Sequence, residues 1–190
     1  MKAYINDLLQ ELNSISRMAV IENALITEKM IGIHSHILKY RWNEEGKEVT
    51  AAKEMDIVRK YCELFRLKHN NVLDFKYTEK SDLKIIFMPH YTIAACIKQI
   101  LTVMDHPIKP FQLHIEVSQK DEVTWICFLF TGPVDFEAVL EKVKQCGKNQ
   151  DYEQFDEVVR RWKEKFGTES FKLELHDISQ RQLEIRFGCQ

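Results

Sequence analysis

The chain has 190 residues, of which 45% are hydrophobic, so it can bury a sizeable core as one compact domain or as a helical arm plus a domain. Its 27 basic and 29 acidic residues are interspersed and leave a net charge of −2, which argues against a nucleic-acid partner. The five cysteines are widely spaced within mostly apolar segments, which favours a reducing compartment over a disulfide framework or a zinc site. No apolar run reaches the roughly 18 residues of a membrane-spanning helix, and the N-terminus resembles no secretory signal.

Apolar residues recur at three- and four-residue steps in the first third of the chain, which predicts three amphipathic helices. The apolar positions fall within residues 5–19, 26–37 and 55–65. Asn23 marks a break between the first two helices, and Thr50 is the expected N-cap of the third. The first two helices have more apolar surface than one partner covers, so we expect a homodimer through residues 1–41. The alternative is an intramolecular packing of three helices.

From residue 70 onward the pattern changes to strands alternating with helices. The predicted strands cover residues 72–77, 111–117, 123–130, 171–175 and 182–187, and the predicted helices cover residues 89–104, 136–146 and 152–166. Pro89 is the expected start of the first of these helices, and Gly167 follows the last. The strand at 123–130 is apolar nearly throughout, so it should be central.

Strands on one side and helices on the other predict an α+β fold, in which an N-terminal helical hairpin is followed by a two-layer α/β sandwich. We place the helical region at residues 1–68 and the sandwich at residues 69–190.

The order of these elements resembles the cytoplasmic kinase core of LytS/YesM-type sensor histidine kinases. The residues that support the resemblance are Leu12-Asn13-Ser14-Ile15, Met30-Ile31, Ser35, Leu38-Lys39-Tyr40, Val49-Thr50, Glu54, Tyr61, Arg66, Met88-Pro89, Val158-Val159, Arg161 and Phe166-Gly167. The resemblance implies a dimerisation and phosphoacceptor region followed by a GHKL-type ATP-binding sandwich. It also implies two-component signalling in a bacterial cytoplasm, with a membrane-bound sensor if residues precede Met1.

The resemblance places the phosphoacceptor position of these kinases at Asn6. An asparagine side chain cannot act as the imidazole nucleophile that accepts a phosphoryl group, because it lacks a basic lone pair. His34 and His36 lie elsewhere, on the second predicted helix, where a solvated or structural histidine is the simpler interpretation.

The resemblance places the nucleotide site at Lys98, Gln99, Phe130, Gly132 and a lid that contains Gln154. In the family a glutamate and a magnesium-binding asparagine occupy the first two positions. Lys98 either neutralises phosphate directly or forms the solvated edge of its helix, and the longer Gln99 displaces the amide oxygen that would meet magnesium. Phe130 replaces an aspartate that accepts a hydrogen bond from adenine, and the lid stretch has one glycine and four acids.

Other chemistries have thin support in the sequence. His114 and His176 could be neighbours on strands, but the sequence identifies no third metal ligand, and we interpret Cys127 as a small core residue. We therefore expect a pseudokinase that acts through dimerisation or through a partner histidine kinase or response regulator, with no metal and no cofactor. The alternative is a divergent, active histidine kinase that uses ATP and magnesium through an altered site.

Overall fold

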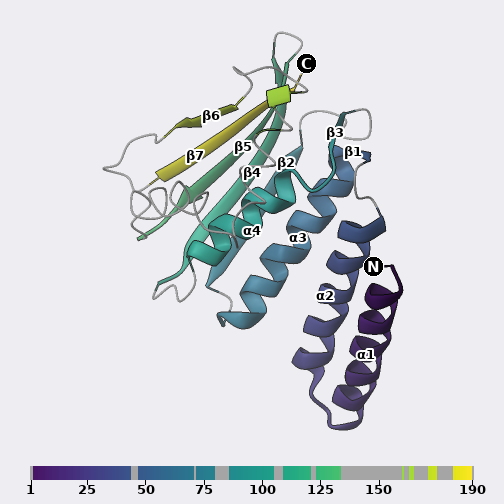
Figure 1. Ribbon diagram of the computed structural model, residues 1–190. Coiled ribbons are helices and arrows are strands. Elements are labelled where there is room, and N and C mark those ends of the chain that lie inside the picture. Colours follow the sequence, from purple (N-terminus) through teal and green to yellow (C-terminus); the bar gives the residue numbers. More distant parts are fainter. Residues whose placement is uncertain are drawn as a thin grey trace. The chain divides into compact units, whose positions relative to one another are not determined.

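The computed structural model describes residues 2–43, 47–70, 72–79, 86–104, 109–120, 123–133, 160, 163–164, 171–174 and 182–189. The chain divides into two compact units, Met1–Glu45 and Gly46–Gln190. The first unit is a hairpin of helices α1 (Lys2–Ile21) and α2 (Leu25–Asn43) (Figure 1). Asn23 lies between them at a positive φ of 57°, a conformation that asparagine tolerates better than most residues. The predicted break between the helices is confirmed.

Helix α3 (Ala51–Lys68), in the second unit, begins at the predicted N-cap. The Thr50 hydroxyl accepts a hydrogen bond of 3.4 Å from the backbone N–H of Lys53. This helix packs against α4 and β2 of the second unit. The compact units therefore divide before α3, whereas the predicted domains divide after residue 68; that domain boundary stays a prediction.

Five strands form the main sheet, in the order β2-β4-β5-β7-β6. Their bounds are Leu73–Glu79 for β2, Phe111–Lys120 for β4, Val123–Thr131 for β5, Phe171–Glu174 for β6 and Gln182–Cys189 for β7. β2 and β4 run parallel, and the other pairs are antiparallel. The predicted central position of the apolar strand at 123–130 is confirmed, because β5 has two strands on either side.

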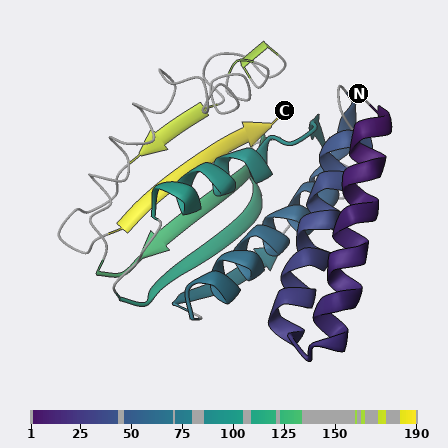
Figure 2. The same ribbon diagram turned by 60° about the horizontal axis from the view of Figure 1, so that its bottom comes forward.

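Helices α3 and α4 (Ile93–Val103) cover one face of this sheet (Figures 1 and 2). The alternation along β4 identifies the buried face of the sheet, because Phe111, Leu113 and Ile115 are buried while Gln112 is exposed. The ring of Phe65 on α3 meets Phe111 edge-on at 5.9 Å between centroids. The α+β architecture predicted from the sequence is confirmed.

The start of the helix after Pro89 is predicted wrongly. Pro89 ends strand β3 (Phe87–Pro89), and α4 begins only at Ile93. β3 pairs antiparallel with β1 (Glu48–Thr50) in a two-stranded sheet that the sequence did not predict. We call this pair of strands the β1–β3 ribbon.

The two helices predicted at residues 136–146 and 152–166, and Gly167 after them, lie outside the described residues, apart from Arg160, Lys163 and Glu164, which are helical. In the part of the chain that the structure describes, no helix is long and apolar enough to cross a membrane.

Candidate functional site

A buried carboxylate holds the start of helix α4. Glu54 on α3 is 0% exposed, and its two carboxylate oxygens accept hydrogen bonds from the backbone N–H groups of Tyr91 at 2.5 Å and Ala94 at 3.1 Å. The first N–H groups of a helix have no partner within the helix, and a negative charge near them is favourable. Glu54 therefore caps α4 from a neighbouring helix, while the N-cap residue Thr92 makes no side-chain cap bond.

Further contacts fix the turn that precedes α4. The hydroxyls of Tyr61 and Tyr91 lie 2.6 Å apart, and the Thr92 hydroxyl donates to the carbonyl of Pro89. Tyr91 has a positive φ of 61°, which is uncommon for a bulky residue. The turn is thus held in a strained conformation by partners on both α3 and β3.

Two cysteines are buried in this helical layer. Burial raises the pKa of the Cys62 thiol, with Arg66 acting in the opposite direction, and burial followed by the nearby charge of Glu54 raises the pKa of the Cys96 thiol. Both thiols therefore stay protonated and behave as small apolar groups.

Two positions at which the family resemblance implies a nucleotide site, Lys98 and Gln99, lie on α4. Lys98 is half-buried, whereas Gln99 is 8% exposed, and the Gln99 Nε2 atom is buried without a hydrogen-bond partner among the described residues. Neither residue is a carboxylate, and the buried atom of Gln99 is a donor rather than the oxygen that magnesium prefers.

The two positions at the end of β5 have different environments. Phe130 is 0% exposed in the core, where it pairs in register with Leu113. Gly132 follows the strand at a φ of 149°, and a Cβ at that position would lie 2.8 Å from the Cβ of Phe111. Phe130 is thus a core residue, while Gly132 permits a close approach of two backbones.

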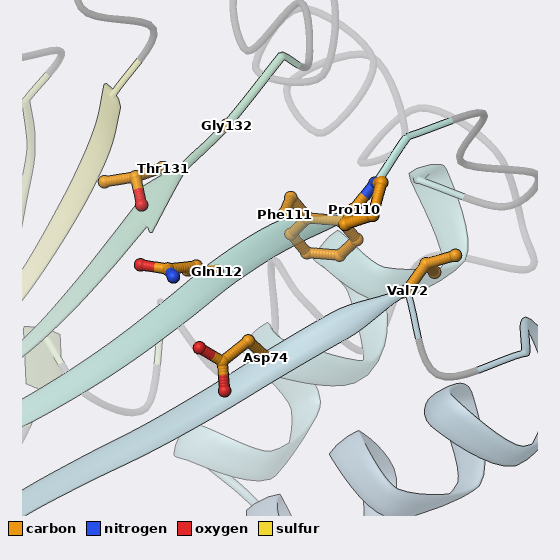
Figure 3. Close-up of a pocket in the computed structure, with 7 residues that line it drawn as sticks. All are labelled: Val72, Asp74, Pro110, Phe111, Gln112, Thr131 and Gly132. Atoms are coloured by element: carbon orange, nitrogen blue, oxygen red, sulfur yellow. The ribbon is translucent and has the colours of Figure 1, made fainter.

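Gly132 also lines a shallow pocket of about 330 Å³ at the ends of β2, β4 and β5 (Figure 3). Its lining residues are Val72, Asp74, Pro110, Phe111, Gln112, Thr131 and Gly132. Asp74, Gln112 and Thr131 form one row, because each is the register partner of the next on adjacent strands. Lys76 Nζ lies 3.7 Å from Asp74, in an exposed ion pair that contributes little to stability.

Of the remaining predicted positions, Asn6 and His114 lie within the described residues. Asn6 is exposed on α1, in the other compact unit, and Gln154 lies outside the described residues. His114 Nε2 lies 2.8 Å from the hydroxyl of Thr78, while His176 lies outside the described residues. Within the described ranges, no group of three or more His, Cys, Asp or Glu side chains could hold a metal ion.

Sequence reasoning did not find the cap made by Glu54. The available signal was an acid at position 54 beside the apolar positions of a predicted helix, but the partners of this acid are backbone N–H groups. The polar row at the pocket was also missed, because it depends on the parallel pairing of β2 and β4.

The fold is similar to that of solved histidine kinases. The histidine kinase domain of a blue-light-activated kinase from Erythrobacter litoralis has a TM-score of 0.51 and 9% identity, with 98% of this chain and 94% of that chain covered. The catalytic domain of the histidine kinase ThkA has a TM-score of 0.49 and 12% identity, with 75% and 93% covered. A ThkA complex with its response regulator protein TrrA has a TM-score of 0.39 and 12% identity, with 100% of this chain and 60% of that chain covered.

No protein-family model matches the sequence, and no curated protein matches it. At 9% identity, the similarity to the Erythrobacter litoralis domain bears on the fold alone. The chain has a histidine-kinase-like fold of the ATPase-like α+β type.

Proposed function

We propose that this chain is a kinase-like domain of two-component signal transduction that transfers no phosphoryl group and acts by dimerisation or by binding a partner kinase or response regulator. The fold supports the kinase-like part of this proposal. The residues at the family's chemical positions support the pseudokinase part.

The observation that carries the proposal is the burial of Phe130. In the resemblance to LytS/YesM-type kinases this position belongs to the aspartate that accepts a hydrogen bond from adenine, yet here it holds an apolar ring that is 0% exposed. An apolar ring cannot accept that bond, and an unpaired adenine donor costs about 1–3 kcal/mol. Asn6 at the phosphoacceptor position also supports the absence of phosphoryl transfer, since an amide is not a nucleophile.

The test is incubation of the full chain with labelled ATP and magnesium. We expect no acid-labile phosphoprotein and no transfer to a response regulator encoded by a neighbouring gene. We also expect no rise in melting temperature at millimolar magnesium-ATP, because a ligand that binds the native state stabilises it by RT ln(1 + [L]/Kd). Binding at micromolar affinity would count against the proposal.

Two observations favour the alternative, a divergent kinase that is still active. Gly132 is retained after β5 and adopts a backbone conformation that its missing Cβ permits, and Gln99 has a buried donor that lacks a described partner. Under this alternative, labelled ATP yields an acid-labile phosphoprotein.

The proposed dimer surface lies at the end of the α1–α2 hairpin. Six large apolar residues there are 51–79% exposed: Ile15, Met18, Val20, Ile21, Leu25 and Ile26. They flank the connection between the two helices, so they form one end of the hairpin (Figure 1). Exposed apolar side chains that gather at one end of a hairpin are typical of an interaction site in soluble proteins, and a second copy of the hairpin presents a matching surface.

A double substitution, Ile21→Glu with Leu25→Glu, tests this surface. We expect the wild-type chain to sediment as a dimer and the variant as a monomer, because two charges would have to be buried at the interface. Asn13→Glu is the matched control, since Asn13 is exposed on α1 two turns before Ile21. A wild-type chain that is monomeric at 100 micromolar would refute the dimer.

A further inference from the structure

The segment that follows the helical hairpin is tied to the start of α4 by hydrogen bonds at both ends of the β1–β3 ribbon. The backbone N–H of Ala51 donates to the carbonyl of Ile86 at 2.9 Å, and the N–H of His90 donates to the carbonyl of Lys47 at 3.1 Å. Between them, Val49 pairs with Met88, and both side chains are buried. The ribbon therefore joins residues 47–50, here named the connector, to the turn before α4.

The connector also runs directly into α3, because Thr50 is both the last residue of β1 and the N-cap of that helix. Glu54 follows one turn later and binds the N–H groups of Tyr91 and Ala94. The contacts thus form a closed circuit that passes from the connector through α3 and Glu54 to the first turn of α4, and back through β3 to the connector.

We propose that this circuit is a coupling device through which displacement of the connector moves the first turn of α4. A fully buried carboxylate with two backbone donors tolerates little change in geometry, because each donor that it loses is left unsatisfied in the core. The first turn of α4 must therefore follow α3 and the connector together. This device does not depend on the proposed loss of phosphoryl transfer and would serve an active kinase equally well.

The competing explanation is that Glu54 is only a local cap for α4. In that case its loss would loosen the two amides that it binds and leave the ribbon unchanged. Residue-resolved hydrogen exchange distinguishes the two explanations, because it reports local opening amide by amide.

The first arm compares the full-length wild type with Glu54→Gln, which has almost the same shape but offers one acceptor and a new donor. We expect exchange to accelerate about tenfold or more at Tyr91 and Ala94, as for a lost bond to a charged group. We also expect acceleration at Ala51 and His90, whose N–H groups do not touch Glu54. Asp56→Asn, at an exposed position on the same helix, is the matched control and should change none of these rates.

The second arm of the experiment changes a residue of the connector instead of Glu54, so it still tests the coupling if Glu54→Gln fails to fold. Val49→Ala removes a buried contact within the ribbon, and coupling predicts faster exchange at Ala94, which lies beyond the ribbon. Changes confined to Tyr91 and Ala94 in the first arm, or to the ribbon in the second, would overturn the coupling. Unchanged rates in both arms would overturn it equally, whatever the outcome of the phosphorylation assay.

Discussion

The hydroxyl groups of Tyr61 and Tyr91 lie 2.6 Å apart, joining the middle of helix α3 to the turn that begins α4. Tyr91 is 5% exposed and adopts a left-handed backbone conformation with a φ of 61°. Such a conformation costs about 1–3 kcal/mol and persists only where the surroundings determine it. Two contacts hold Tyr91 in this conformation: the hydrogen bond between the two hydroxyl groups, and the bond that its backbone N–H donates to Glu54.

Removal of either hydroxyl should weaken the native state to a similar extent. We expect Tyr61→Phe and Tyr91→Phe each to lower the free energy of unfolding by about 0.5–1.5 kcal/mol, because one part-buried hydrogen bond is lost. The double variant should cost little more than either single change, since both remove the same bond. Urea unfolding of the four proteins measures this cycle. Strict additivity would show that the two hydroxyls do not interact.

Two glycines should respond oppositely to alanine. Gly132→Ala would place a Cβ 2.8 Å from the Cβ of Phe111 at a φ of 149°, so we expect a loss of about 1–3 kcal/mol. Gly32→Ala, in helix α2, meets no atom within 4 Å and should gain about 0.5–1 kcal/mol from helix propensity. Thermal unfolding of both variants makes the comparison. Equal effects would mean that Gly132 does not approach Phe111 as described.

The strands of the main sheet were predictable from the sequence because their residues follow recognisable patterns. The alternation from Phe111 to Val117 identified the buried face of β4, and the apolar run from 123 to 130 identified the central strand. Thr50 was predictable as an N-cap because threonine is a preferred N-cap residue and stands just before apolar residues that recur at helical spacing. Both features can be seen in the local sequence.

The ribbon and the start of α4 were not predictable in the same way. β1 and β3 have three residues each, too few for a period, and Pro89 suits a strand end as well as a first helical turn. The partners of Glu54 are backbone N–H groups, which no side-chain pattern reveals. At positions 98 and 99 the sequence gives the residue types, lysine and glutamine. Only the structure shows that the Nε2 atom of Gln99 is buried without a described hydrogen-bond partner.

The buried thiols should make stability depend on alkaline pH. Because folding raises the pKa of Cys62 and Cys96, the unfolded chain releases these protons above the ordinary thiol value of 9.0 while the native chain keeps them. The free energy of unfolding should therefore fall as the pH rises above 9, by up to about 1.4 kcal/mol per pH unit for each thiol. Urea titrations at pH 8 and pH 10 measure this slope.

The double variant Cys62→Ala with Cys96→Ala provides the control for that slope, since tyrosine and lysine titrate in the same range. We expect the wild type to lose more stability than the double variant between the two pH values. Parallel losses would show that neither thiol is shielded from ionisation.

An aspartate introduced at position 130 should destroy the fold rather than create an adenine site. Phe130→Asp removes a fully buried ring and introduces a charge into the core, so we expect a loss of more than about 3 kcal/mol. Thr131→Asp, at the next and half-buried position, is the control and should cost much less. Circular dichroism and urea unfolding compare the two. A folded Phe130→Asp protein that binds magnesium-ATP would reassign this position to a nucleotide site.

The strand order has a consequence for synthesis of the protein. β7 lies between β5 and β6, so the growing chain cannot complete its sheet until residues 182–189 have been made. Until then the apolar strand β5 has an unpaired edge, which is the kind of surface through which nascent chains aggregate. Synthesis that stops before β7 should therefore yield insoluble chains that need a chaperone, however well the helices and the first three strands of the sheet have formed.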